Sequence, residues 1–201
     1  MARVAGILLA AGESRRMGYP KPLLKIGDHT FVEQVIATML EVVHEVVVVL
    51  GAHAERIRPA IPDDYRLTII ENRNFLRGQL SSLQIGIRAL PAEIDGVMVH
   101  LADHPTVRAD TFRAVLSSYG HGGKQIVIAR HQGRRGHPVI FDRSVFDELM
   151  HTPDAEGARA VVNADPSRVS YVDIDDPGVV LDLDTPEDVE QAGLVAPPRE
   201  W

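Results

Sequence analysis

The segment best suited to chemistry runs from Leu9 to Leu23 and reads LAAGESRRMGYPKPL. The small residues at positions 10–12 let a backbone approach a ligand closely, and their N–H groups can donate hydrogen bonds to phosphate oxygens. Ser14 adds a hydroxyl group, and Arg16 and Lys21 add the positive charge that suits phosphate. The segment is neither a Walker motif nor the Rossmann Gly-x-Gly-x-x-Gly motif. We therefore expect either a phosphate-binding loop of another type or a solvated basic turn.

Carboxylates follow two short apolar runs. Asp103 comes shortly after Val97–Leu101, and Asp182 and Asp184 come after Val179–Leu181. Mg²⁺ is a hard ion that keeps several waters and needs only one or two protein carboxylates beside substrate phosphates. We expect Asp103 to bind Mg²⁺ together with either Asp182 or Asp184. The alternative is that these acids only cap or precede helices.

Two glycine-containing turns supply further candidates. Ser81 and Ser82 follow Gly78, and they are either N-caps of the next helix or hydroxyl groups that contact a ribose or a base. Gly136 and His137 stand just before an apolar run. His137 either binds a second substrate through a phosphate or a pterin-like group, or bonds backbone in the turn. No His-Glu-x-x-His motif or comparable spacing indicates a zinc site.

Composition limits the class of protein and its partners. The chain has 201 residues, 45% of them hydrophobic, which is enough for one domain with a substantial core. A net charge of −7 gives no overall attraction to nucleic acid or to an anionic membrane. The absence of cysteine excludes disulfides and thiolate nucleophiles and fits a reducing cytoplasm. The run Val4–Leu9 is too short to span a membrane and lacks the form of a secretory signal, so we expect a buried first strand.

Strand-like and helix-like patterns alternate along the chain. The expected strands are poorly alternating, β-branched runs: Val4–Leu9, Val46–Leu50, Leu67–Ile70, Val97–Leu101, Ile126–Ala129 and Pro138–Phe141. The expected helices cover Phe31–Leu40, Leu83–Leu90, Phe112–Leu116, Glu156–Asn163 and Pro186–Gln191, the last capped by Thr185. This alternation predicts an α/β fold with a mainly parallel sheet, whose ligands bind beyond the carboxyl ends of the strands. We expect one domain over residues 1–195 and a loose tail over 196–201.

The first loop resembles the Leu-Ala-Ala-Gly-x-Ser-x-Arg-Met-Gly…Lys signature of the MobA-like NTP transferases. Within that family it is most similar to molybdenum cofactor cytidylyltransferases. The similarity continues in order along nearly the whole chain, through Val49–Gly51, Gly78–Leu83, Ala102–Pro105, Gly136–Val139 and Asp182–Asp188. Two positions depart from the family pattern, which often has Met or Gln in place of His104 and Gly in place of Leu80.

The resemblance implies a three-layer, Rossmann-like α/β fold of the nucleotide-diphospho-sugar transferase type. It implies a nucleotide-binding N-terminal half and an acceptor-binding C-terminal half. It also implies a Mg²⁺-dependent transfer with Arg16, Lys21 and Asp103 as catalytic residues, and Asp103, Asp182 and Asp184 as candidate metal ligands. The expected nucleotide-binding residues are Leu9, Ala10, Ala11, Gly12, Ser14, Arg16, Lys21, Gly78, Ser81 and Ser82, and the expected acceptor-binding residues are Gly136 and His137.

The resemblance implies the substrates as well. Ala11 accompanies cytidine-type enzymes in the family, so we expect CMP transfer from CTP to a molybdopterin-type phosphorylated acceptor with release of pyrophosphate. A molybdoenzyme or a cofactor-insertion protein is the expected protein partner. The alternatives are GTP as the nucleotide, another phosphorylated acceptor, and a non-catalytic cofactor-binding protein. A Rossmann oxidoreductase is disfavoured, because the dinucleotide fingerprint is absent from the sequence.

Overall fold

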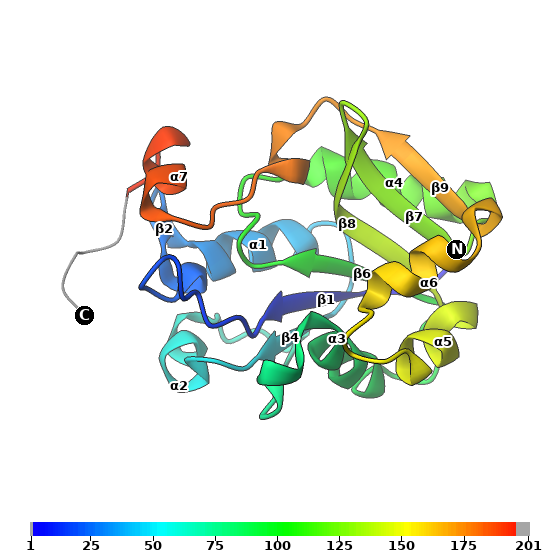
Figure 1. Ribbon diagram of the computed structural model, residues 1–201, viewed down its shortest axis with the longest axis horizontal. Coiled ribbons are helices and arrows are strands. Elements are labelled where there is room, and N and C mark those ends of the chain that lie inside the picture. Colours follow the sequence, from blue (N-terminus) through cyan, green and yellow to red (C-terminus); the bar gives the residue numbers. More distant parts are fainter. Residues whose placement is uncertain (1, 196–201) are drawn as a thin grey trace.

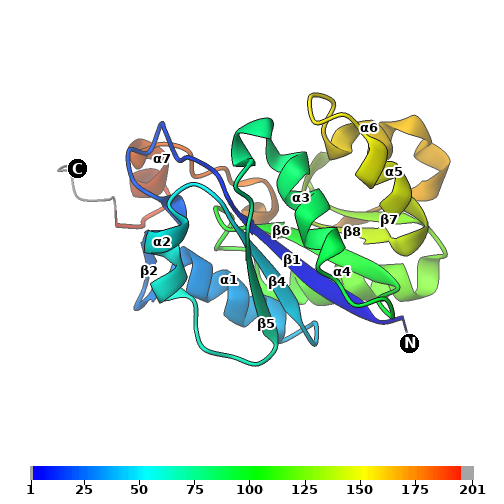
Figure 2. The ribbon, with the colours of Figure 1, turned by 90° about the horizontal axis from the view of Figure 1, so that it is seen from below.

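A seven-stranded sheet with the strand order β5-β4-β1-β6-β8-β7-β9 forms the centre of the molecule (Figure 1). The computed structural model describes residues 2–195. The strands are β1 (Val4–Ala10), β4 (Val46–Leu50), β5 (Leu67–Glu71), β6 (Gly96–Leu101), β7 (Ile126–His131), β8 (Arg134–Asp142) and β9 (Val169–Asp173), beside a small hairpin of β2 (Lys25–Ile26) and β3 (His29–Thr30). Figure 2 shows β5, β4, β1 and β6 side by side. Strand β8 is antiparallel to its two neighbours and the other pairs of the large sheet are parallel, which confirms the mainly parallel sheet.

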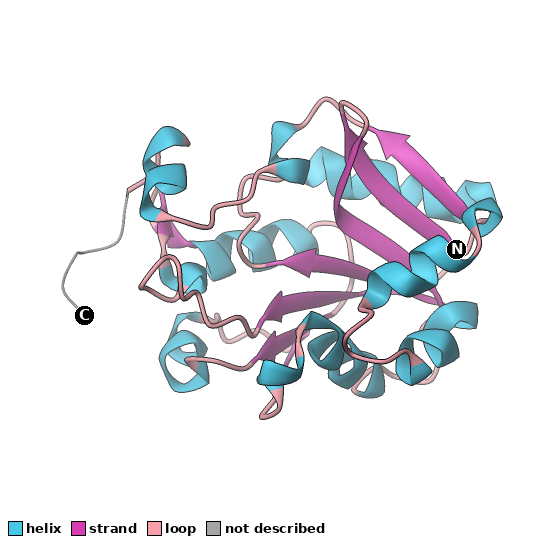
Figure 3. Cartoon of the chain, viewed as in Figure 1, coloured by secondary structure: helices cyan, strands magenta, loops and turns pink. Residues whose placement is uncertain are grey.

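Helices cover both faces of this sheet and complete three layers (Figure 3). The α-helices are α1 (Phe31–Leu40), α2 (Ala54–Ile57), α3 (Gln79–Arg88), α4 (Ala109–Gly122), α5 (Phe146–His151), α6 (Ala158–Ala164) and α7 (Pro186–Gln191). The 3₁₀ turns are η1 (Lys21–Leu23), η2 (Arg58–Ala60), η3 (Phe75–Arg77), η4 (Arg143–Val145), η5 (Pro166–Arg168) and η6 (Pro177–Val180). Helices α1 and α4 share one apolar core with the sheet, and α3, α5 and α6 share the other. The predicted three-layer α/β fold is therefore confirmed.

The inner strands form because their residues are apolar on both sides. All five residues of β4 and all seven of β1 are buried, which matches continuous apolar runs rather than alternating ones. Strand β8 begins at Arg134, four residues before the predicted start, because its first part extends beyond the core and carries polar side chains. The sequence patterns missed α2, α5 and the β2–β3 hairpin, which are too short to show a period. They also missed the edge strand β9, most of whose residues are only partly buried.

The last helix over the described residues 2–195 is α7. Helix α7 starts where Thr185 predicted it, with a capping box in which Thr185 and Asp188 exchange hydrogen bonds. Figure 1 shows α7 beside β2, at the edge of the sheet to which the arrows of β1 and β6 point. The expected tail over 196–201 lies outside the described residues. None of the described helices is long and apolar enough to cross a membrane.

The turn η6 lies directly on β8, and this contact brings the last part of the chain back to the sheet. A Cβ atom on Gly136 of β8 would lie 1.8 Å from the carbonyl oxygen of Val179. A Cβ atom on Gly178 would lie 2.9 Å from the backbone of Thr106 and Val107. Only glycine permits these two backbone approaches, and the residues after η6 then continue toward the carboxyl ends of β1 and β6.

We expect Gly136→Ala to lower the free energy of unfolding by about 3 kcal/mol, because the new methyl group overlaps the Val179 carbonyl. Urea denaturation measures the change. Gly120→Ala is the matched control, since no atom outside its own helix lies within 4 Å of that Cβ position. The control is expected to keep or slightly raise stability. Equal stability of the two variants would contradict the close contact between η6 and β8.

Candidate active site

A cleft of about 410 Å³ opens at the carboxyl ends of the central strands. These ends lie side by side, because Leu9 pairs with Val49 on one side and with Leu101 on the other. Every residue predicted to bind the nucleotide lines the cleft except Ser81, and Asp103 and Asp184 line it as well. The other lining residues are Glu13, Arg15, Pro22, Phe75, Leu76, Gln79, Leu101 and Ala102. Segments that are far apart in the sequence thus meet at one site.

The loop after β1 is held in shape by its own hydrogen bonds. Ser14 has a left-handed backbone with φ of 53°, and its carbonyl accepts hydrogen bonds from the N–H groups of Met17 and Gly18. The Ser14 hydroxyl accepts a hydrogen bond of 3.0 Å from the backbone N–H of Lys21, which leaves its own proton free to donate. Met17 is buried against Phe31 and anchors the loop on α1. The loop therefore fixes the start of η1 and with it Lys21.

The ammonium group of Lys21 lies between two carboxylates. Its Nζ is 2.9 Å from Asp103 Oδ2 and 2.5 Å from Asp184 Oδ1, and Lys21 itself is only 9% exposed. Burial lowers the pKa of Lys21, but the two carboxylates outweigh burial and raise the pKa above its ordinary value. Lys21 is therefore charged at neutral pH, and its charge holds Asp103 and Asp184 at the same point.

Asp184 receives a second cation from the same loop. Arg16 donates to Asp184 Oδ2 at 2.7 Å, and its side chain is 70% exposed at the rim of the cleft. The hydrogen bond from Lys21, with a smaller contribution from Arg16, holds the pKa of Asp184 below its ordinary value. The ionised carboxylate of Asp184 therefore lies between the positive charges of Lys21 and Arg16.

The structure brings Asp184, and not Asp182, to Asp103. Asp182 does not line the cleft; its side chain is 67% exposed and lies 3.4 Å from His104 Nε2. Leu183, between the two acids, is fully buried and fixes which of them turns inward. Asp103 is not a helix cap, because α4 begins at Ala109 with Arg108 as its N-cap.

The donor set of the cleft fits Mg²⁺. Asp103 and Asp184 offer only oxygen ligands. Asp103 Oδ2 and Asp184 Oδ1 both contact Lys21 Nζ, so the distance between these two oxygens cannot exceed the sum of the two contact distances. Over residues 2–195 no group of three or more His, Cys, Asp or Glu side chains could hold a metal alone. Phosphate oxygens of a bound substrate would have to complete the coordination, as is usual for this ion.

Ser81 and Ser82 start α3 in a way that the sequence did not predict. The N-cap is Gly78, so neither serine caps the helix. Ser81 donates to the Gly78 carbonyl at 2.7 Å, and the amide of the fully buried Asn72 donates to both serine hydroxyls at 2.9 Å. The sequence patterns do not single out Asn72, whose one signal is its place directly after β5 at the carboxyl edge of the sheet. Ser82 keeps a place in the cleft and Ser81 points away from it.

Comparison with known proteins decides the family. The model of the MobA-like NTP transferase domain matches residues 6–169. The chain belongs to this family. It is a nucleotidyltransferase of the MobA-like family, related to the molybdenum cofactor cytidylyl- and guanylyltransferases.

Three relatives of this MobA-like protein extend over nearly its whole length. The molybdenum cofactor cytidylyltransferase of Escherichia coli (strain K12) is 27% identical, with 94% of each chain covered. Nicotine blue oxidoreductase of Paenarthrobacter nicotinovorans is 33% identical, with 92% of this chain and 93% of the relative covered. The crystal structure of Rv0371c from Mycobacterium tuberculosis H37Rv superposes with a TM-score of 0.81 at 27% identity, covering 95% of this chain and 97% of that one. A manganese complex of the Mycobacterium tuberculosis protein gives a TM-score of 0.73 at 26% identity, covering 94% of this chain and 97% of that one.

Three histidines lie together behind the cleft of the MobA-like protein. The ring centres of His104 and His137 are 5.7 Å apart, and His100 is 6.1 Å and 6.3 Å from them. The His100 ring bonds the His104 carbonyl at 3.1 Å, and His104 Nδ1 lies 3.3 Å from the carbonyl oxygen of Gly178 in η6. His104 thus ties the turn that carries Asp103 to η6. Its place beside Asp103 was the only sequence signal for this role.

The predicted acceptor-binding residues do not line the cleft. Gly136 packs against η6, and His137 lies among the other two histidines. Burial, with a smaller contribution from the nearby His104, lowers the pKa of His137 to about 3, and burial places the pKa of His100 well below its ordinary value. Both rings are therefore neutral at physiological pH.

We expect acid to begin to destabilise the protein above the pH range in which carboxylates protonate. The unfolded His137 takes up a proton near pH 6.5, whereas the folded one does so near pH 3, so the free energy of unfolding falls as the pH drops through that window. Urea denaturation at pH 7.5 and pH 5 measures the fall. His137→Gln should reduce it, because one of the two neutral rings is gone. His121→Gln, at an exposed site on α4, is the control, and an equal fall in all three proteins would contradict this origin.

Proposed function

We propose that this protein transfers CMP from CTP to a molybdopterin-type phosphorylated acceptor, with Mg²⁺ as the cofactor and pyrophosphate as the product. The observation that carries the proposal is the contact of Lys21 with Asp103 and Asp184 on the floor of a glycine-loop cleft. A triphosphate needs cations for its oxygens and carboxylates for its metal ion, and the cleft presents both within one ion-pair network. The proposed reaction and the cysteine-free sequence fit a cytoplasmic enzyme.

Asp103 and Asp184 are the residues that hold the metal in this proposal. When bound there, Mg²⁺ neutralises and polarises phosphate oxygens. Mg²⁺ and Mn²⁺ prefer similar oxygen ligands, and the manganese complex of the Mycobacterium tuberculosis relative supports a divalent ion in this fold. Leu183 and the contact of His104 with η6 keep Asp184 turned toward the cleft.

The reaction needs positioning and charge neutralisation more than covalent chemistry. An oxygen of the acceptor phosphate attacks the α-phosphorus of the nucleotide in line, and the bond from that phosphorus to the oxygen bridging to the β-phosphate breaks. The backbone N–H groups at 10–12 and the Ser14 hydroxyl bind phosphate oxygens, and Lys21 and Arg16 neutralise the charge on the departing pyrophosphate. The acceptor phosphate is already ionised, so the step needs no general base.

CTP is favoured over GTP by two observations. Ala11 lines the cleft where the resemblance associates alanine with cytidine-type enzymes. The Escherichia coli relative, which is similar over 94% of both chains, is a cytidylyltransferase. A molybdopterin-type acceptor follows from the same relative, and a molybdoenzyme or cofactor-insertion protein is the partner that would receive the product. GTP and other phosphorylated acceptors are the competing substrates.

A redox function is the second candidate, because the relative named nicotine blue oxidoreductase is 33% identical. The cleft of the present chain lacks the Gly-x-Gly-x-x-Gly turn that binds a dinucleotide. NADH and NADPH therefore belong in the same ligand screen as the NTPs. Binding or oxidation of either, without pyrophosphate release from any NTP, would favour the redox function.

We expect Asp103→Asn and Asp184→Asn each to lower kcat about 100-fold, because each removes one of the two carboxylates that hold the metal. Asp182→Asn should change kcat less than about threefold, because Asp182 lies outside the cleft. Pyrophosphate release measures the rates, and thermal melting shows whether the variants stay folded. Full activity of Asp103→Asn, or equal losses in Asp182→Asn and Asp184→Asn, would overturn the assigned carboxylates.

We expect CTP with Mg²⁺ to raise the melting temperature more than the other NTPs do. A ligand at 100 times its Kd stabilises a protein by about 2.7 kcal/mol, which a thermal-shift assay resolves. Lys21→Ala should lose most of this shift, because Lys21 is the buried cation of the cleft. Lys25→Ala, at an exposed position nearby, should keep the shift. A larger shift with GTP would replace CTP as the substrate, and no shift with any NTP would contradict the proposed function.

A further inference from the structure

One wall of the cleft is a single 3₁₀ turn that few contacts support. Phe75 and Leu76 of η3 line the cleft, and Leu76 is 71% exposed. Gly78 follows directly, and its φ of 104° is a backbone conformation that glycine adopts without strain and other residues rarely adopt. Apart from the contact of Phe75 with Gly51, polar contacts must therefore fix this turn.

Behind η3 lies a second cavity of about 410 Å³. Asn72, Asn74, Ser81 and Gln84 line it together with Arg77, so the Arg77 end of the turn borders open space, while Phe75 at the other end packs on Gly51. A turn with few buried apolar contacts is held less firmly than the core of a domain. Its position then depends on the polar contacts at its ends.

The side chain of Arg77 supplies such a contact. Its Nε donates to Asp154 Oδ2 at 2.5 Å, and over residues 2–195 this is the one side-chain hydrogen bond or ion pair that joins η3 to the segment between α5 and α6 or to any other part of the chain. Asp154 is 17% exposed, and its Oδ1 atom is buried without a hydrogen-bond partner, so Arg77 supplies the opposite charge that this carboxylate needs.

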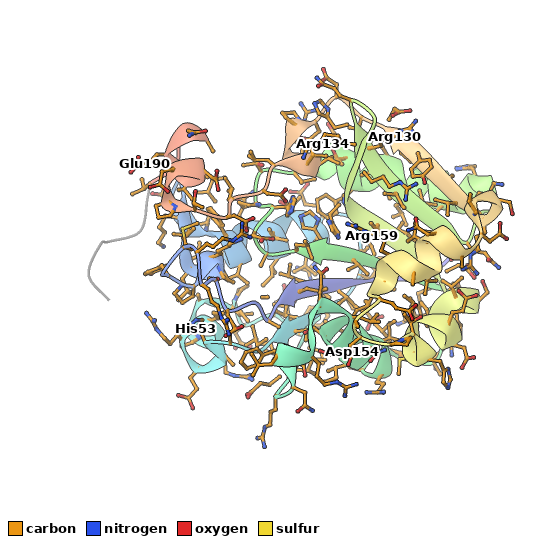
Figure 4. The ribbon with its side chains drawn as sticks, viewed as in Figure 1. His53, Arg130, Arg134, Asp154, Arg159 and Glu190 are labelled. Atoms are coloured by element: carbon orange, nitrogen blue, oxygen red, sulfur yellow. The ribbon has the colours of Figure 1, made fainter. Side chains whose placement is uncertain are left out.

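The turn that carries Asp154 is itself fixed on α3. The buried amide of Gln84 donates to the carbonyls of Leu149 and Thr152, at 2.9 Å and 3.3 Å. The backbone of Asp154 then accepts a hydrogen bond from Gly157, which leads into α6. Figure 4 shows Asp154 on the segment beside α3. Arg77 therefore reaches a fixed point that belongs to the second half of the chain.

We infer that Arg77 and Asp154 form a positioning pair that holds η3 in place as the nucleotide-facing wall of the cleft. The inference rests on the proposed function, because it assigns the cleft to an NTP. Neither residue is catalytic: Asp154 does not line the cleft, and Arg77 acts through Phe75 and Leu76. The pair also links the nucleotide-binding wall to the turn before α6, in the half of the chain that the proposal gives to the acceptor.

The test compares Arg77→Gln, Asp154→Asn and the double variant with the unaltered protein. Calorimetric titration with CTP and Mg²⁺, without any acceptor, gives the Kd, and steady-state pyrophosphate release gives kcat and KM. Each single variant should raise the Kd for CTP about fivefold, because losing a partly exposed ion pair has an effect of this order on an equilibrium constant. The kcat should change less than twofold. The double variant should be no weaker than either single variant, since the pair is lost once.

The control is Asp64→Asn, which removes the ion pair between Asp64 Oδ2 and Arg66 Nη2, 2.6 Å apart. Both residues of this pair lie outside the cleft. This variant should leave the Kd for CTP unchanged. If all variants bind CTP with the same Kd, the inference is overturned and the proposed function stands. The same holds if the losses of CTP affinity are additive in the double variant, or if they change in parallel with the melting temperature of each variant. If the unaltered protein binds no NTP, the proposed function fails and this inference fails with it.

Discussion

The site depends on one buried ammonium group that two carboxylates share. Lys21 bonds Asp103 and Asp184, which lie 82 and 163 residues away along the chain. A buried cation requires opposite charge close by, and its own charge offsets the repulsion between the two carboxylates that share it. The contact therefore assembles three distant segments before any ligand arrives. The same arrangement makes the floor of the cleft suitable for a triphosphate with a divalent ion.

The sheet positions the glycine loop and Asp103, whereas Asp184 is positioned by a contact outside the sheet ladder. Strands β1 and β6 are adjacent, so the glycine loop and Asp103 leave the sheet at neighbouring points. Asp184 has no strand to position it. It is placed by η6, which lies on β8 at Gly136 and is tied to the Asp103 turn through His104. The rigid part of the site is thus built from the sheet, and the final carboxylate depends on glycine and histidine contacts outside the cleft.

The parts of the fold that could be predicted are those whose signal is local. Continuous apolar runs identified the buried strands, and the Thr185 box identified the start of α7. The choice between Asp182 and Asp184 could not be predicted, because it depends on which way Leu183 is buried after η6. The start of α3 differs from the prediction for a similar reason. The turn η3 ends at Arg77 and makes Gly78 the cap, and a one-turn element leaves no period in the sequence.

The late position of Asp184 has a consequence for biosynthesis. The family match ends at residue 169, and Asp184 lies beyond it, after η6. A nascent chain emerges from the ribosome amino end first, so the glycine loop and Asp103 exist long before the second carboxylate has been synthesised. Until then Lys21 has only one of its two anionic partners. Translation therefore supplies the second carboxylate of the cleft well after its other groups, and a chain that ends before residue 184 carries an electrostatically unbalanced half-site.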